Sequence, residues 1–178
     1  MKMLRCMFMA TAVSLTGCAA NVVKVPTTGT PPVNVPAESS KNIVLNLSGA
    51  AKAVRAADWP AFSGEWRGAV AAEASAAGVS FNVQEGEPAP TGQPGTLISV
   101  FVNDYRYVST GARYGLGVFT GNAFVDAKVR FLDLKTGQSF GDQTINTSSS
   151  AWQGVFSAMT DKQLQAIAKE LVNDVKPR

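Results

Sequence analysis

Carboxylates gather around one expected β-hairpin, and a carboxylate pair is the group in this chain best suited to acid–base chemistry. Asp126 lies on the first expected strand, Asp133 in the turn and Asp142 on the returning strand. Paired carboxylates can transfer protons or bind a cation. However, Asp126 alternates with Lys128 and Arg130, which is typical of a solvated strand face. Because Asp133 also fits turn chemistry, we predict that these carboxylates neither catalyse a reaction nor bind a metal.

A glycine-rich segment, residues 111–121, is the second feature that could bind a ligand. A phosphate-binding loop needs a strand before it and a helix N-terminus after it, so that backbone amides and the helix dipole converge. Here a strand is expected to follow, which favours a simple crossover loop. The alternative is a partner-binding loop that uses Arg113, Tyr114 and Phe119, because these residue types are common anchors at protein interfaces.

Composition excludes several classes of active site. None of the 178 residues is histidine, so His-based triads, His metal ligands and a His general base are absent. No Gly-x-Ser-x-Gly or Ser-x-x-Lys motif occurs after residue 18. Removing Lys2 and Arg5 with an expected signal segment leaves 14 of the 16 basic residues against 13 acidic ones. We therefore predict no enzyme activity, no cofactor and no nucleic-acid partner.

The start of the chain has the organisation of a secretory signal. Lys2 and Arg5 form a short basic region, and residues 6–15 form an apolar stretch. This stretch is shorter than the roughly 20 apolar residues that a transmembrane helix needs. We therefore predict that residues 1–17 are a removable signal peptide.

The signal ends in Leu15-Thr16-Gly17-Cys18, which resembles a bacterial lipobox. The resemblance implies that Leu15, Thr16 and Gly17 are recognised by the signal peptidase and that the chain is cut before Cys18. It also implies that the Cys18 thiol carries diacylglycerol and that the new amine is acylated. Stable anchoring generally takes two lipid chains, so a triacylated Cys18 would hold the protein on a membrane.

The same resemblance indicates where the protein would be held. Position 19 is alanine, whereas an aspartate there commonly signals retention at the inner membrane. We therefore expect an outer-membrane anchor with the domain on the periplasmic side. Cys6 would leave with the signal and Cys18 would carry lipid, so the mature body would contain no disulfide and no reactive thiol.

Residues 18–40 are predicted to be a tether between the lipidated cysteine and the domain. They contain Pro26, Pro31, Pro32 and Pro36, and proline fixes φ and removes a hydrogen-bond donor. In an extended polyproline form at about 3.1 Å per residue, this stretch would reach up to roughly 70 Å. A single α+β domain would then occupy residues 41–178.

Hydrophobic periodicity predicts the elements of that domain. Alternating apolar residues predict strands, and apolar residues at helical spacing predict two helices. The predicted strands are 43–47, 79–83, 96–108, 123–132 and 140–147, and the predicted helices are 58–77 and 160–175. Asp58 is expected to cap the first helix, and Thr160 with Gln163 to form a capping box on the second. The order β-α-β-β-β-β-α predicts an α+β fold with a mostly antiparallel sheet and two helices on one face.

Tyr105 and Tyr107 are predicted to share a strand face with Phe101. Such an aromatic row most often packs beneath a helix, but it can also line a surface for a ligand or for peptidoglycan. Both tyrosines are therefore possible partner-binding residues.

One stretch resembles a known group of proteins. The segment from Gly111 to Gly121, the strand 123–132 and the turn Asp133-Leu-Lys-Thr-Gly137 together resemble a family of small bacterial lipoproteins with a domain of unknown function. The resemblance implies a cell-envelope location and an α+β fold, and it supplies no substrate and no active residue.

The sequence therefore predicts a non-enzymatic, lipid-anchored envelope protein whose domain binds another envelope protein. The alternative is a binding module for a small ligand or a glycan such as peptidoglycan. That alternative requires a concave pocket of several hundred Å³.

Overall fold

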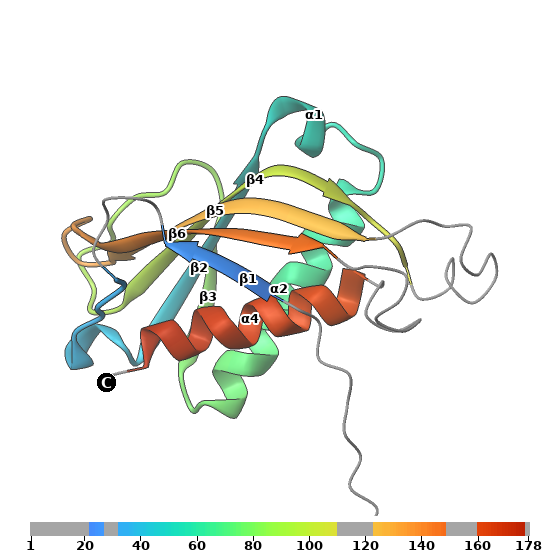
Figure 1. Ribbon diagram of the computed structural model, residues 1–178. Helices are drawn as coiled ribbons and strands as arrows, with labels where there is room; N and C mark the ends of the chain where they lie inside the picture. Colours follow the sequence, from blue (N-terminus) through green and yellow to red (C-terminus); the bar gives the residue numbers. More distant parts are fainter. Residues whose placement is uncertain (1–21, 27–31, 110–122, 149–159, 177–178) are drawn as a thin grey trace, which may run out of the picture.

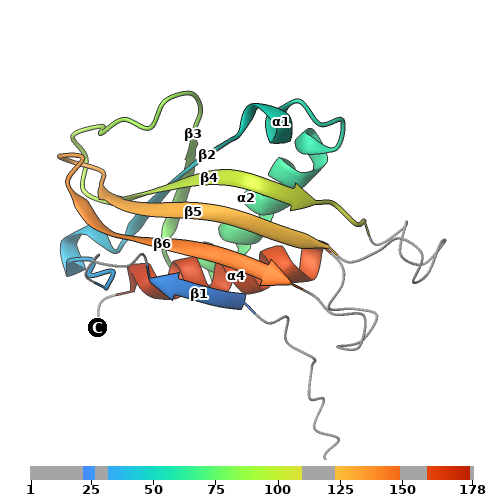
Figure 2. The same ribbon diagram turned by 45° about the horizontal axis from the view of Figure 1, so that its top comes forward.

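A six-stranded sheet forms the centre of the protein, in the order β1-β6-β5-β4-β2-β3. The computed structural model describes residues 22–26, 32–109, 123–148 and 160–176. The strands are β1 (Val22–Pro26), β2 (Asn42–Gly49), β3 (Ser80–Gln84), β4 (Thr96–Arg106), β5 (Phe124–Asp133) and β6 (Ser139–Ser148). The helices are η1 (Ala37–Ser39), α1 (Ala51–Val54), α2 (Trp59–Ala76) and α4 (Thr160–Val175). Both long helices, α2 and α4, lie on the same face of the sheet (Figures 1 and 2).

The predicted α+β class is confirmed, although the sheet is mixed. β2 runs parallel to both β3 and β4, whereas the β4–β5, β5–β6 and β1–β6 pairs are antiparallel. The parallel β2–β3 pair follows from α2, because a crossover helix returns the chain to the starting end of β2. Within the described parts of the chain, no helix is both long enough and apolar enough to cross a membrane.

The main core lies between the sheet and the two long helices. On α2 the buried apolar residues recur every four positions, and on α4 they form one continuous face. They are Phe62, Trp66, Val70 and Ala74 on α2, and Leu164, Ile167, Ala168, Leu171, Val172 and Val175 on α4. Burial of each large apolar side chain stabilises the fold by about 1.5–3 kcal/mol, so these two stripes hold both helices on one sheet face.

Much of the predicted tether belongs to the domain instead. Residues 22–26 form β1, which pairs with β6 along the sheet edge. Val33 and Val35 are 8% and 7% exposed, and the backbone N–H of Asn34 donates to the carbonyl of Phe140 at 3.0 Å. The number of prolines wrongly indicated a tether throughout this stretch. Valine is a strong strand former, and Pro26 lies at a sheet edge, where proline is tolerated. The domain therefore begins near residue 22 rather than at residue 41.

A β-bulge in β4 changes which residues face the helices. The register against β5 shifts between Val102 and Asp104. An extra residue at a bulge moves the following side chains to the opposite face of the sheet. Tyr105 therefore lies on the helix-covered face, whereas Phe101 lies on the uncovered face with 43% of its surface exposed. The prediction that these two aromatic residues share a face was wrong.

Neither predicted helix cap forms as expected. Asp58 has helical dihedral angles and makes no side-chain capping bond. The Gln163 side chain donates to the carbonyl of Ala123 at 2.9 Å and accepts from the hydroxyl of Thr147 at 3.1 Å. The hydroxyl of Thr160 accepts from the backbone N–H of Val108 at 2.8 Å. These polar side chains form hydrogen bonds with other elements instead of with the first turn of their own helix. The bonds therefore connect the helices to the sheet.

Candidate functional site

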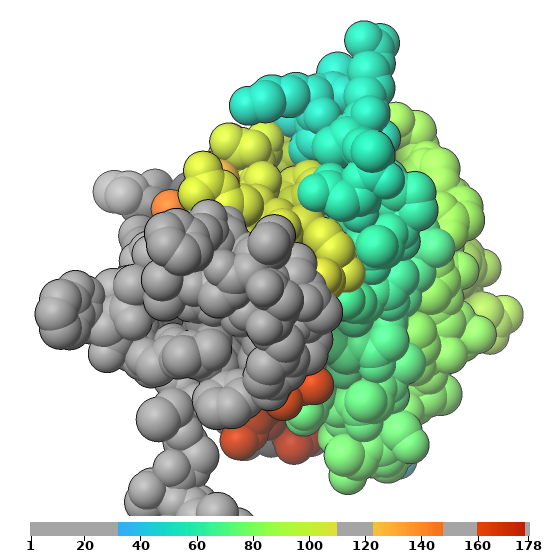
Figure 3. All heavy atoms as spheres, turned by 90° about the vertical axis from the view of Figure 1, so that its right-hand side faces the viewer, coloured from blue at the N-terminus to red at the C-terminus, as the bar shows by residue number. Residues whose placement is uncertain are grey.

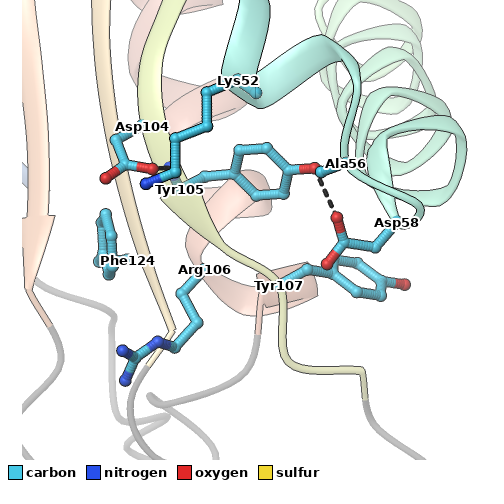
Figure 4. Close-up of a pocket in the computed structure, with 9 residues that line it drawn as sticks. Lys52, Ala56, Asp58, Asp104, Tyr105, Arg106, Tyr107 and Phe124 are labelled. Atoms are coloured by element: carbon cyan, nitrogen blue, oxygen red, sulfur yellow. Dashed lines mark hydrogen bonds between the residues drawn. The ribbon is translucent and has the colours of Figure 1, made fainter.

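The first candidate site is a cavity of about 310 Å³ at the end of β4, here called the Tyr105 pocket. It opens at the end of the molecule shown in Figure 3, where α1 lies beside the end of β4. α1, the connection between α1 and α2, β4 and β5 all contribute to its walls, and Figure 4 shows how these side chains lie. The lining residues are Lys52, Ala53, Ala56, Asp58, Asp104, Tyr105, Arg106, Tyr107 and Phe124.

Tyr105 is held rigidly by contacts on the helix-covered face of the sheet. Its ring stacks on Phe62 at a centroid distance of 4.0 Å and lies 6.0 Å from the ring of Trp59. Its hydroxyl donates to Oδ1 of Asp58 at 2.6 Å. Burial raises the pKa of the Tyr105 phenol, and the hydrogen bond to Asp58 raises this pKa further. The phenol is therefore neutral at physiological pH and acts as a structural donor.

Tyr107 makes the second hydroxyl–carboxylate contact at this end. Its hydroxyl donates to Oε1 of Glu65 on α2 at 2.7 Å. Burial, and then the hydrogen bond to Glu65, raise the pKa of Tyr107 to about 12. The structure thus brings the two predicted partner-binding tyrosines together. Both hydroxyls, however, already donate hydrogen bonds to carboxylates, that of Asp58 before α2 and that of Glu65 on α2.

The cations of the Tyr105 pocket are less constrained than its carboxylates. Asp58 accepts from the Tyr105 hydroxyl, and Asp104 accepts from the backbone N–H of Tyr105 at 2.9 Å. Lys52 extends into the pocket (Figure 4), and the described residues give it no ion pair. Arg106 lies 5.9 Å from the centroid of the Phe124 ring, which is cation–π distance. The pocket therefore presents its positive groups to an incoming ligand.

The second candidate site is a groove of about 430 Å³ on the uncovered sheet face, here called the Phe101 groove. Lys128 is the cross-strand partner of Phe101, and Arg130 is that of Ser99. Both cations are exposed, so an aromatic ring and two positive charges lie side by side. The lining residues are Ser48, Gly49, Glu87, Pro88, Ser99, Phe101, Lys128 and Arg130.

The sequence pattern did not predict the Phe101 groove. Alternation along β4 placed Phe101 on one face with Ser99, which was a usable signal. The alternation could not show that none of the described helices covers this face.

A smaller cavity of about 280 Å³ lies between α2 and α4. Glu65, Glu73 and Asp161 line it, and one oxygen each of Glu65 and Asp161 is buried without a hydrogen-bond partner. Among the described residues, no group of three or more acidic side chains has a geometry that could hold a metal ion. This cavity therefore gives no metal centre.

The three predicted hairpin carboxylates are not brought together into a site. Asp133 accepts from the backbone N–H of Lys135 at 3.0 Å and from the hydroxyl of Thr136 at 2.7 Å, as its turn role requires. Asp126 accepts from the side-chain amide of Asn103 at 3.3 Å, and Asp142 from the hydroxyl of Ser139 at 3.4 Å.

Several predicted functional residues lie outside the described ranges. These are the signal and lipidation residues Leu15, Thr16, Gly17 and Cys18, and the loop residues Arg113, Tyr114 and Phe119.

Comparison with known proteins finds structures with a similar fold but assigns the chain to no family. No protein-family model matches the chain, and no curated protein matches it. Two crystal structures of PelC from Paraburkholderia phytofirmans, described as a dodecamer, are similar with TM-scores of 0.52 and 0.53. Each is 12% identical and covers 89% of this chain and 99% of PelC. Protein XCC0632 from Xanthomonas campestris, of the DUF330 family, is 17% identical over 86% of this chain and 90% of its own length, with a TM-score of 0.45.

Proposed function

We propose that this protein is a lipid-anchored component of a bacterial cell envelope, held at the outer membrane with its domain on the periplasmic side. The observation that carries the proposal is the Leu15-Thr16-Gly17-Cys18 sequence directly after a basic and apolar start. A signal of this kind supplies a bilayer anchor without a transmembrane helix. The folded domain begins four residues later, at Val22.

We further propose that the domain binds another envelope protein rather than catalysing a reaction. The hydroxyls of Tyr105 and Tyr107 are committed to carboxylates, and the raised pKa of each phenol disfavours its use as a base. The chain has no histidine to take that role. The described cavities therefore favour recognition over chemistry.

The Phe101 groove is the surface that we assign to this partner. A large aromatic residue that is 43% exposed on an uncovered sheet face is a typical interface anchor. Lys128 and Arg130 beside it favour a partner surface that combines an apolar side chain with acidic residues. A second copy of this chain is one such partner to test, because PelC, which shares the fold, is a dodecamer.

The anchor is tested with two matched cysteine substitutions. Cys18→Ser removes the proposed lipidation site, whereas Cys6→Ser changes a residue of the same type inside the proposed signal. Membrane flotation should retain the Cys6→Ser protein and lose the Cys18→Ser protein. Equal retention of both proteins would contradict the proposed anchor.

The partner surface is tested with a photo-crosslinking residue in living cells. Placed at position 101, it should give a discrete crosslinked species, which mass spectrometry then identifies. Placed at the exposed Lys169 on α4, it should give none, because this position lies on the opposite side of the sheet. The same pattern of species from both positions would contradict a partner at the groove.

The second candidate function is glycan binding, and the groove itself favours it. A cavity of about 430 Å³ lined by Phe101 and two serines offers a stacking surface with hydroxyl groups beside it. Calorimetric titration with soluble peptidoglycan fragments tests this function. Binding that Phe101→Ser abolishes would favour the glycan over the protein partner.

A further inference from the structure

We propose that the end of the sheet at which β1 begins faces the lipid bilayer, and that α1 and Arg106 contact the anionic headgroups of phospholipids there. This inference rests on the proposed lipidation of Cys18. It assigns a membrane contact to the folded domain itself, in addition to the lipid anchor.

A short length of chain connects the proposed anchor to the domain. Val22 lies four positions after Cys18, and a fully extended chain spans at most about 3.3–3.6 Å per residue. Val22 therefore lies within roughly 14 Å of the lipidated residue. A domain on so short a connection cannot stand far from the bilayer surface.

The register of the sheet fixes which residues lie in the same row as Val22. Val22 pairs with Thr147, Thr147 with Val125, and Val125 with Tyr105. These residues form one row across four strands. Neighbouring strands are about 4.8 Å apart, so the row places the Tyr105 end of β4 roughly 15 Å from Val22.

The position of α1 follows from where β2 ends. Gly49, the last residue of β2, pairs with Val102 of β4, and the backbone N–H of Ala50 donates to the carbonyl of Val102 at 2.9 Å. α1 therefore follows β2 at the same end of the sheet as Tyr105. Figure 3 shows this end, where α1 protrudes beside the end of β4.

The exposed residues at this end include an aliphatic side chain and several cations. Val54 is 39% exposed, and the neighbouring Lys52 and Arg55 are exposed as well. Arg106 adds a further exposed cation at the end of β4. Neither Lys52 nor Arg55 has an ion-pair partner among the described residues. An exposed aliphatic side chain flanked by cations fits the headgroup region of an anionic bilayer.

The carboxylates that bond to Tyr105 and Tyr107 are less exposed than the cations at this end. Asp58 and Asp104 both accept hydrogen bonds from Tyr105, and Glu65 accepts one from Tyr107. These three groups are part-buried, whereas Lys52, Arg55 and Arg106 are exposed. Lys52 is turned toward the Tyr105 pocket (Figure 4), and all three cations are more accessible than the carboxylates.

Site-directed fluorescence tests the orientation in the lipidated full-length protein. With Cys6 removed and the Cys18 thiol alkylated, a cysteine introduced by Val54→Cys is the single free thiol. Lys135→Cys, in the exposed turn between β5 and β6, is the matched control at the opposite end of the sheet. Both proteins are labelled with bimane and placed in phosphatidylglycerol–phosphatidylethanolamine vesicles that contain lipids with nitroxide headgroups.

The label at position 54 should be quenched several-fold more strongly than the label at position 135. Equal quenching, or stronger quenching at 135, in protein that floats with the vesicles would overturn the orientation and leave the anchor intact. If neither protein floats with the vesicles, the proposed lipidation fails, and this inference fails with it.

Charge reversal separates the contact from the effect of the anchor. Lys52→Glu/Arg55→Glu should lower the quenching at position 54, whereas Lys128→Glu/Arg130→Glu, on the open sheet face, should leave it unchanged. An equal effect of the two double variants, or no effect of either, would contradict a specific headgroup contact at α1.

Discussion

The hydroxyl of Tyr105 donates a hydrogen bond of 2.6 Å to Oδ1 of Asp58. This bond joins the end of β4 to the residue before α2, two positions that are 47 residues apart in the chain. It also explains why Asp58 does not cap the helix, since its carboxylate is turned to the sheet instead. The contact is structural, and it fixes one wall of the Tyr105 pocket.

The Tyr105–Asp58 bond should contribute measurably to stability. Tyr105→Phe leaves a part-buried carboxylate without its hydroxyl donor, and hydrogen bonds to charged groups are worth about 1.5–3 kcal/mol. We expect the free energy of unfolding in denaturant titrations to fall by roughly that amount. In a double-mutant cycle with Asp58→Ala, the two losses should be non-additive. Strictly additive losses would show that the two side chains do not interact.

Tyr107 should ionise only at strongly alkaline pH. Its pKa is raised from 10.0 to about 12 by burial and by Glu65. The chain has three tyrosines, so in a Tyr105→Phe/Tyr114→Phe protein the absorbance of tyrosinate at 295 nm reports Tyr107 alone. A midpoint close to 12 is expected for the folded protein, and a midpoint near 10 would contradict the contact.

The same shift makes stability depend on pH in a defined direction. Because the folded-state pKa exceeds the unfolded value of 10.0, the contribution of Tyr107 is complete below pH 10 and is lost as the pH rises toward 12. Tyr107→Phe should therefore reduce the loss of stability in that window, as measured by thermal unfolding. If the Tyr107→Phe protein loses as much stability over this pH range as the unsubstituted protein, groups other than Tyr107 cause the loss.

The hydrophobic pattern was enough to predict most of the elements but not their packing. Both long helices and the antiparallel core of the sheet follow from the spacing of apolar residues, as in the Leu164 to Val175 face of α4. Two features did not follow. The bulge after Val102 cannot be recognised from the alternation of residue types along the sequence. The strand β1 was hidden in a stretch whose prolines are typical of a linker.

Gly141 should tolerate no side chain, because it holds the N-terminal segment against the sheet. Its φ is +139°, and an added Cβ would lie 2.9 Å from the Cα of Val33. We expect Gly141→Ala to destabilise the protein by about 1–3 kcal/mol. Gly64→Ala is the matched control in α2, where nothing lies within 4 Å of an added Cβ. It should stabilise the protein by about 0.5–1 kcal/mol. Equal changes in the free energy of unfolding for the two substitutions would contradict the proposed role of Gly141.

Gln163 should matter far more than the neighbouring Gln165. Gln163 is 1% exposed and bridges Thr147 and the carbonyl of Ala123, whereas Gln165 is exposed. Gln163→Leu removes both bonds from a buried site, at a cost of about 1–3 kcal/mol. Gln165→Leu should change the free energy of unfolding by less than about 0.5 kcal/mol. Chemical denaturation of both variants measures the difference, and similar losses would contradict the bridge.

The candidate site was harder to predict than the fold for a physical reason. Tyr105 and Tyr107 were singled out as possible partner-binding residues, and both line the Tyr105 pocket. Their hydroxyl partners Asp58 and Glu65, however, are more than 40 residues away in the chain. No local spacing reveals such a contact. Phe101 was missed because its exposure depends on the two long described helices both lying over the other sheet face, which is a property of the tertiary arrangement.

The most direct test of the central claim is the mass of the mature N-terminus. Protein expressed from the full-length gene in a bacterial host is extracted from membranes, digested and analysed by mass spectrometry. The account predicts a first residue of Cys18 that carries a diacylglyceryl thioether and an acylated amine. A mature protein that starts elsewhere, or that carries an unmodified Cys18 thiol, would contradict the proposed anchor and the membrane orientation derived from it.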